Sequence, residues 1–123
     1  MIAGHAGIVL IVTGAMTASA VLAAVAPTFA LEQLFGIADP DRAIVLIARH
    51  WALLVASVGC LLVFAGASGV AQGPVILAGL VEKIAIVALL LASPFRSRPL
   101  ARAIVIADGT MSLLYLALLA AGR

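Results

Sequence analysis

The sequence has little charge, few aromatic residues and a single cysteine. Charged residues make up 10% of the 123 residues and aromatic residues 5%, whereas 66% are hydrophobic. A soluble domain of this length does not bury that much apolar surface, so the composition excludes a water-soluble class. The one cysteine, Cys60, provides no disulfide framework, and its small apolar side chain suits a contact between helices. We therefore expect lipid to be the solvent of the folded chain.

Motifs of familiar enzymes are also missing. The sequence contains no HExxH, no GxSxG, no glycine-rich phosphate loop and no Cys/His metal spacing. These absences exclude the usual zinc-protease, serine-hydrolase and nucleotide-binding classes, and we expect no bound metal. The net charge of +2 comes from a few basic residues that lie mainly near the ends of apolar runs. That placement is typical of basic residues that set the orientation of a membrane protein, and it is not typical of a nucleic-acid-binding surface.

Four apolar runs are present, and turn-forming or basic residues separate them. At ~1.5 Å per residue each run is long enough for a hydrocarbon core of ~30 Å. Short connections favour antiparallel neighbours, so the sequence predicts an all-α fold. We expect a single domain, a four-transmembrane-helix bundle with up-down-up-down topology. The expected helices cover about residues 2–26, 40–66, 74–93 and 100–121.

The first apolar run, Ile2–Ala26, ends at Pro27, which cannot continue a helix. A cleavable signal peptide is the alternative, because Thr28-Phe29-Ala30 resembles a small-x-small cleavage site. No Lys or Arg precedes the run, which is longer than the usual apolar region of about 7–15 residues in a signal peptide. We expect the run to be retained as a helix.

Hydrophobicity falls between residues 28 and 41, where turn formers appear, so we expect a structured loop. Asp39 followed by Pro40 has the form of an N-cap with proline at the first helical position, which predicts that the second helix starts at Pro40. In a short amphipathic turn, three apolar side chains of this segment would face acyl chains, namely Leu31, Leu34 and Phe35.

Arginine is distributed unevenly between the two expected membrane faces. With four crossings, both termini share one face, which carries Arg123. The other face carries Arg42, Arg96, Arg98 and Arg102. The positive-inside rule then predicts that these arginine-bearing loops are cytoplasmic and that both termini lie outside.

Charged side chains also occur inside the apolar runs. Arg49 and His50 lie in the second expected helix, Glu82 and Lys83 in the third, and Asp108 in the fourth. Helix rise places all five at similar depth near the bilayer centre, where an unpaired charge costs several kcal/mol. The four charges sum to zero if His50 is neutral. We expect Arg49 to pair with Glu82 and Lys83 with Asp108, with His50 hydrogen-bonded nearby.

Two interpretations of this set remain open. The charges either fix helix register in lipid or form a proton-active or ligand-binding pocket, as intramembrane ionisable residues often do. Trp51 is too deep for an aromatic belt, so it either lines that pocket or fills core volume. The candidate site residues are Arg49, His50, Trp51, Glu82, Lys83 and Asp108.

Other residues predict packing rather than chemistry. His5 and His50 invite a haem hypothesis, but a ~9 Å axial offset is awkward for two axial ligands, so we expect no haem. Tyr115 is expected to be an interface anchor near the outer end of the last helix. The first helix carries small or hydroxyl residues that suit close packing within the chain, or else a dimer seam: Gly7, Thr13, Gly14, Thr17, Ala20 and Ala24.

The pattern of three segments resembles the small bacterial four-helix membrane proteins grouped as DoxX-like. These segments are ARHWALLVASVGCLLVFAG, a helix containing VEKIAIVALLL, and a fourth helix with ADGTMSLLYLALL. Some members are described as membrane subunits of quinone-linked oxidoreductases. The resemblance implies a four-helix bundle of the bacterial cytoplasmic membrane with quinone or lipid contact, and it carries over no catalytic residue.

Three function classes follow. The first is a membrane protein that binds an apolar ligand such as a quinone, sterol or other lipid, or that acts as an accessory subunit, with a homodimer or a larger membrane complex as its possible assembly. The second is a small proton-coupled transporter, which the absence of an acidic residue from the first helix disfavours. The third is a lipid isomerase using His50, Glu82 and Asp108. We adopt the first.

Overall fold

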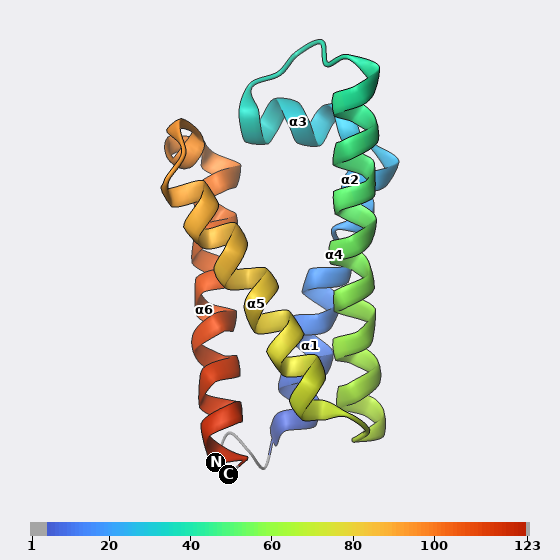
Figure 1. The fold of residues 1–123 in the computed structure, drawn as a ribbon, viewed down its shortest axis with the longest axis vertical. Helices are drawn as coiled ribbons and strands as arrows, with labels where there is room; N and C mark the ends of the chain where they lie inside the picture. The colour runs from blue at the N-terminus through green and yellow to red at the C-terminus, as the bar shows by residue number, and fades with distance from the viewer. Residues whose placement is uncertain (1–4, 123) are drawn as a thin grey trace.

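The computed structural model describes residues 5–122, which form an all-α bundle (Figure 1). Four stretches are long and apolar enough to cross a membrane, so the expected class is confirmed: Ala6–Val25, Arg42–Ser68, Gln72–Leu91 and Pro99–Ala121. The elements are α1 (Ala6–Ala18), α2 (Val21–Val25), α3 (Pro27–Phe35), α4 (Arg42–Ser68), α5 (Gln72–Leu91), the 3-10 helix η2 (Pro94–Ser97) and α6 (Pro99–Ala121).

The long helices run up, down, up and down, and both ends of the chain lie at the same end of the bundle (Figure 1). α1 and α2 pack along α4, and α5 packs along α6, so the bundle consists of two helix pairs. A short turn at residues 69–71 joins α4 to α5 and brings the pairs together at the lower end of Figure 1. Large apolar side chains cover the outside of the helices, which is the surface that lipid solvates.

Four glycines form the contact between α1 and α4. Gly7 lies against Gly66, and Gly14 lies against Gly59. A Cβ atom added to Gly14 would lie 2.8 Å from the Gly59 carbonyl oxygen, and one added to Gly66 would lie 2.7 Å from that of Gly7. The two backbones therefore touch, as close-packed membrane helices with small residues do. This seam lies within one chain, whereas Cys60, which was expected at a helix contact, is exposed.

A continuous apolar core fills the lower half of the bundle, where the two pairs meet. Tyr115 is fully buried in it, and its hydroxyl donates a hydrogen bond to Thr13 Oγ1 at 2.6 Å. The expectation that Tyr115 anchors the membrane interface is therefore wrong, because Thr13 supplies the polar partner that the interface would have supplied. The buried members of the core are Leu10, Leu62, Ala65, Ile76, Leu80, Met111, Tyr115 and Leu118.

In the upper half the two pairs separate, and α3 lies across the gap between them (Figure 1). The expected loop is present only at residues 36–41, and for residues 28–35 the expectation is wrong, because Pro27 occupies the first turn of a helix that continues to Phe35. Leu31 and Leu34 are buried and do not face acyl chains, and Leu34 packs against α5 and α6 in a second, smaller core. α3 is thus the roof of a space between the pairs.

Helix boundaries also differ from the expected ones. The first span is interrupted at residues 19–20, and residues 2–4 lie outside the described part of the chain. The second begins at Arg42, because the carboxylate of Asp41 accepts a hydrogen bond from Ile44 N at 2.9 Å and so forms the N-cap. The third begins at Gln72, two residues before Pro74.

Arg98, at the start of α6, holds the roof helix in place. Its Nε donates to Gln33 O at 2.9 Å and its Nη2 to Glu32 O at 2.8 Å. These carbonyls end α3, where Gly36 takes the left-handed conformation with φ of 70°. A helix C-terminus has carbonyls without intrahelical partners, and a cation beside them is favourable.

We expect Arg98→Ala to loosen α3 without unfolding the bundle. Loss of two charge-assisted hydrogen bonds at an exposed site is expected to raise amide hydrogen exchange in residues 28–36 about tenfold, which corresponds to about 1.4 kcal/mol. Arg102→Ala removes an exposed arginine of the same helix and serves as the control. Equal exchange in the two variants would show that Arg98 does not hold the roof.

Candidate functional site

Lys83 is the centre of a charged cluster inside the bundle. Its side chain is 1% exposed, and Nζ donates to Thr17 Oγ1 at 2.7 Å and to Glu82 Oε1 at 3.4 Å. Asp108 Oδ1 lies 3.6 Å from the same nitrogen, so the expected pairing of Lys83 with Asp108 is present. We call Thr17, Glu82, Lys83 and Asp108 the Lys83 cluster. Three separate spans contribute to it, which ties both helix pairs together.

The Lys83 cluster lies near mid-membrane depth. Lys83 is 11 residues from the first residue of α5 and 8 from its last. Asp108 follows the first residue of α6 by 9. At ~1.5 Å per residue, both positions are more than 10 Å from either end of their helices. Bulk water at the membrane faces is therefore too far away to solvate the cluster directly, and contacts inside the bundle stabilise its charges.

Thr17 is the partner that sequence reasoning did not assign to Lys83. Its hydroxyl donates to Thr13 O at 2.8 Å and accepts from Lys83, so it satisfies its own helix and the neighbouring one. Thr13 in turn accepts from Tyr115, which continues the polar contacts into the lower core. The sequence does contain a signal for this contact, namely a hydroxyl side chain in the first helix at the depth of Lys83.

Arg49 does not pair with Glu82, and that expectation is wrong. Its Nε donates to Ala24 O at 3.0 Å on the neighbouring α2, and among residues 5–122 the ion pairs of Glu82 and Asp108 involve only Lys83. The break before Pro27 removes helical partners from the last carbonyls of α2. Arg49 donates a hydrogen bond to one of these carbonyls, that of Ala24. It therefore caps α2 and is not a member of the Lys83 cluster.

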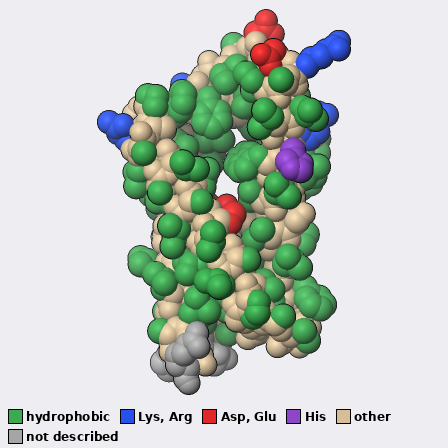
Figure 2. Space-filling view, in the orientation of Figure 1, with side chains coloured by type: hydrophobic (Ala, Val, Ile, Leu, Met, Phe, Trp, Pro, Cys, Tyr) green, Lys and Arg blue, Asp and Glu red, His purple; other side chains and the backbone are tan. Residues whose placement is uncertain are grey.

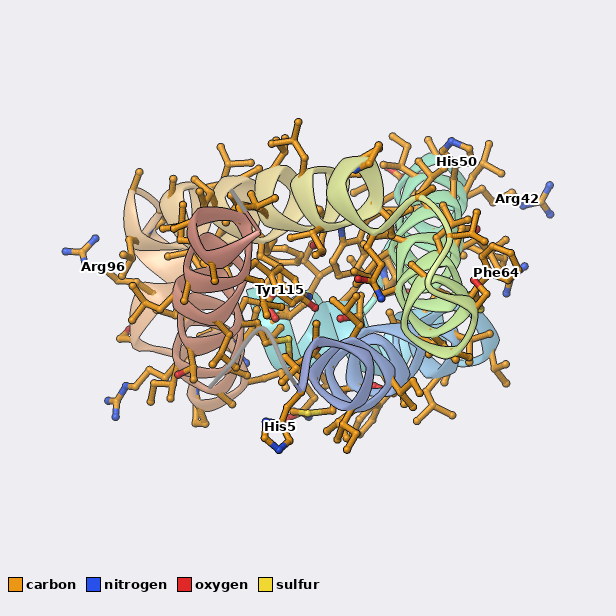
Figure 3. All side chains as sticks on the ribbon, turned by 90° about the horizontal axis from the view of Figure 1, so that it is seen from below. His5, Arg42, His50, Phe64, Arg96 and Tyr115 are labelled. Atoms are coloured by element: carbon orange, nitrogen blue, oxygen red, sulfur yellow. The ribbon has the colours of Figure 1, made fainter. Side chains whose placement is uncertain are left out.

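His50 is exposed on the outside of α4 and does not reach the Lys83 cluster (Figure 3). The expectation that it hydrogen-bonds beside the charges is therefore wrong. His5 lies on the opposite side of the bundle in the same view. Within the described residues, no group of three or more His, Cys, Asp or Glu side chains is arranged to hold a metal ion.

A cavity of about 310 Å³ lies above the core, and the charged members of the Lys83 cluster form one of its walls. A second cavity of about 430 Å³ adjoins it beneath α3, between α4 and α5, and its lining is almost entirely apolar. The hollow is visible in Figure 2, where an acidic side chain shows at its lower edge. The two cavities lie side by side, because five residues line both: Ala23, Ala30, Leu34, Trp51 and Ile86.

Trp51 is half-buried and lines both cavities, whereas its neighbours Arg49 and His50 line neither. The roof helix contributes Phe29, Ala30 and Leu34, which sequence reasoning missed because it treated this segment as a loop. The space is therefore polar at one end and apolar at the other, and its charged side chains all lie at the polar end.

A groove between α1 and α6 connects this space to the outside of the bundle. It shares Thr17, Ile104 and Asp108 with the charged cavity, and it is the side on which the two helix pairs stand apart (Figure 3). Because the surrounding surface is apolar, the groove faces the region that lipid occupies.

These features define a helical membrane protein with four candidate spans and a laterally open, amphiphilic cavity around a buried lysine. No protein-family model, curated protein or solved structure matches the chain. The DoxX-like resemblance thus stays a prediction from sequence.

Proposed function

We propose that this protein binds an apolar or amphiphilic ligand, of the class that includes quinones, sterols and other lipids, within the space between its two helix pairs. The observation that carries the proposal is the pair of adjoining cavities, one with Glu82, Lys83 and Asp108 in its wall and the other with apolar walls. Ligand sites are typically apolar with a few polar groups that fix orientation, and volumes of about 300–1,000 Å³ are usual. Each cavity falls in this range.

The position of the cavity favours entry from the membrane. The groove between α1 and α6 gives lateral access, and the core around Leu10, Leu62 and Tyr115 fills the bundle below. A transporter needs a water path to both faces, which this packed core does not favour. The exposed position of His50 likewise removes one member of the residue set that the isomerase hypothesis requires.

The setting of the protein is part of the proposal. Four arginines lie in or beside the connections at the roof end, opposite the end that carries both termini: Arg42, Arg96, Arg98 and Arg102. The positive-inside rule supports a cytoplasmic roof and outward termini. The DoxX-like pattern supports the bacterial cytoplasmic membrane and a role as a lipid- or quinone-contacting accessory subunit.

Filling the cavity tests the proposal. Ala30 lies on the roof helix and lines both cavities, so Ala30→Phe is expected to occupy the space that a ligand would take. Ala78→Phe places the same ring on the exposed face of α5 and is the control. Native mass spectrometry of protein released from membranes is expected to show a bound lipid-sized mass in the wild type and in Ala78→Phe, reduced at least fivefold in Ala30→Phe.

The same mass spectra decide the outcome. Equal ligand occupancy in Ala30→Phe and the wild type would place the ligand elsewhere. The absence of any retained mass in all three proteins, after mild detergent exchange, would contradict the proposal. Ala23→Leu fills the same space from α2 and replaces Ala30→Phe if that variant does not fold.

A further inference from the structure

The Lys83 ammonium is enclosed by partners from the protein itself. An ammonium group has three N–H donors. Nζ donates hydrogen bonds to Thr17 at 2.7 Å and to Glu82 at 3.4 Å, and Asp108 forms an ion pair with it at 3.6 Å. The lysine is also 1% exposed, so a ligand in the cavity meets very little of it. A ligand anion or carbonyl would have to displace one of these partners to reach the charge.

The two carboxylates, by contrast, keep unused acceptor capacity. Glu82 and Asp108 each direct one oxygen to Lys83, and their other oxygens, Oε2 and Oδ2, have no hydrogen-bond partner within residues 5–122. Both side chains are 17% exposed, and both line the charged cavity. An ionised carboxylate accepts at about four lone-pair sites. The wall of the cavity therefore offers acceptors to a ligand.

The charges of the cluster do not balance. Among the residues lining the two adjoining cavities, the charged side chains are Glu82, Lys83 and Asp108, which together carry one excess negative charge when ionised. Arg49, which would have balanced the set, caps α2 outside the cavities. An uncompensated charge next to an apolar space is costly because the local dielectric is low. A positive charge in the cavity would lower that cost.

We infer that the ligand is a cationic amphiphile whose ammonium head lies against Glu82 and Asp108 and whose hydrocarbon chain occupies the apolar cavity beneath α3. The inference rests on the proposed function and narrows its ligand class to molecules with a protonated amine head. The head supplies the donor and the charge that the cavity wall lacks. The chain packs against Ile44, Ile47 and Leu90, which line that cavity.

Trp51 gives a direct readout, because it is the sole tryptophan of the chain and lines both cavities. The protein is reconstituted in phosphatidylcholine nanodiscs and titrated with three terminally brominated dodecyl compounds that differ only in the head: an amine, an alcohol and a carboxylate. At about pH 7 the amine is protonated. Quenching of Trp51 by the amine is expected at a concentration at least tenfold lower than for the alcohol, and by the carboxylate at a higher concentration still.

Variants separate the charge from the cavity. Glu82→Gln and Asp108→Asn each leave a one-to-one pair with Lys83, so each is expected to abolish the preference for the amine while the alcohol still quenches. Ala30→Phe is expected to weaken quenching by all three compounds. The quenching that remains in this variant comes from amphiphile dissolved in the nanodisc lipid, and it is subtracted from the quenching of the wild type.

Each outcome decides a separate point. Equal quenching by the amine and the alcohol, with Ala30→Phe defective for both, would overturn the cationic head and leave cavity binding intact. Tightest binding of the carboxylate would show that Lys83 faces the ligand and would also overturn the inference. Equal quenching of the wild type and Ala30→Phe by every compound would contradict the proposed function itself.

Discussion

Lys83→Met is expected to lower the free energy of unfolding by about 3–5 kcal/mol, the usual cost of removing one partner from a buried ionic group. The substitution keeps an unbranched side chain of similar length but leaves Glu82 and Asp108 without a counter-charge near mid-membrane depth. Thr17 also loses the donor that lies 2.7 Å from its oxygen. Unfolding by SDS titration in mixed micelles measures the effect.

Removing all three charges together is expected to restore most of that stability. In the triple variant Lys83→Met, Glu82→Gln, Asp108→Asn no ion is left unpaired, and replacement of a complete buried ionic group is often neutral or stabilising. Glu82→Gln alone keeps the Lys83–Asp108 pair, so its cost is expected to be well below that of Lys83→Met. Additive losses across these variants would show that the three groups do not interact.

Gly59→Leu is expected to destabilise the bundle by about 3 kcal/mol or more, at the upper end of the overpacking range. A Cβ atom at this position would overlap the backbone of Ala18 and the carbonyl oxygen of Gly14, and neither backbone can move without opening the α1–α4 contact. Thermal unfolding in detergent measures the loss.

Gly109→Leu is the matched control for the glycine seam. Gly109 also lies inside a long helix, but a Cβ there meets nothing within 4 Å. Because glycine is about 1 kcal/mol less favourable than alanine in a helix interior, this change is expected to be neutral or stabilising. A similar loss of stability in both variants would mean that close approach of α1 and α4 is not what Gly59 provides.

The number of spans and the depth of the charges were predictable from sequence, since both depend on hydropathy and helix rise alone. The direction in which each charge points was not. Arg49 has a depth compatible with the cluster, yet the local break between α2 and α3 gives it a carbonyl to cap. That break depends on Pro27 within the fold, and helix-rise arithmetic contains no information about it.

The roof helix was missed for a different reason. Glycine, aspartate and proline near residues 36–40 predicted a loop, and they do form one, but only after Phe35. The spacing of Leu31 and Leu34 indicated an amphipathic turn correctly, while the side it faces depends on the gap between the helix pairs. A gap of this kind arises from packing between distant segments. The apolar half of the candidate site was therefore hidden from sequence reasoning.

The most direct test of the buried cluster uses the fact that Lys83 is the only lysine in the sequence. Protein labelled with ¹⁵N-lysine and ¹³C-carboxyl aspartate and glutamate, reconstituted in bilayers, gives a single side-chain nitrogen signal in magic-angle-spinning NMR. Dipolar recoupling is expected to show contact of this nitrogen with one glutamate and one aspartate carboxylate, and Glu82→Gln and Asp108→Asn should each remove one of the two. A lysine nitrogen coupled to neither carboxylate would contradict the arrangement of charges on which the cavity and its proposed ligand depend.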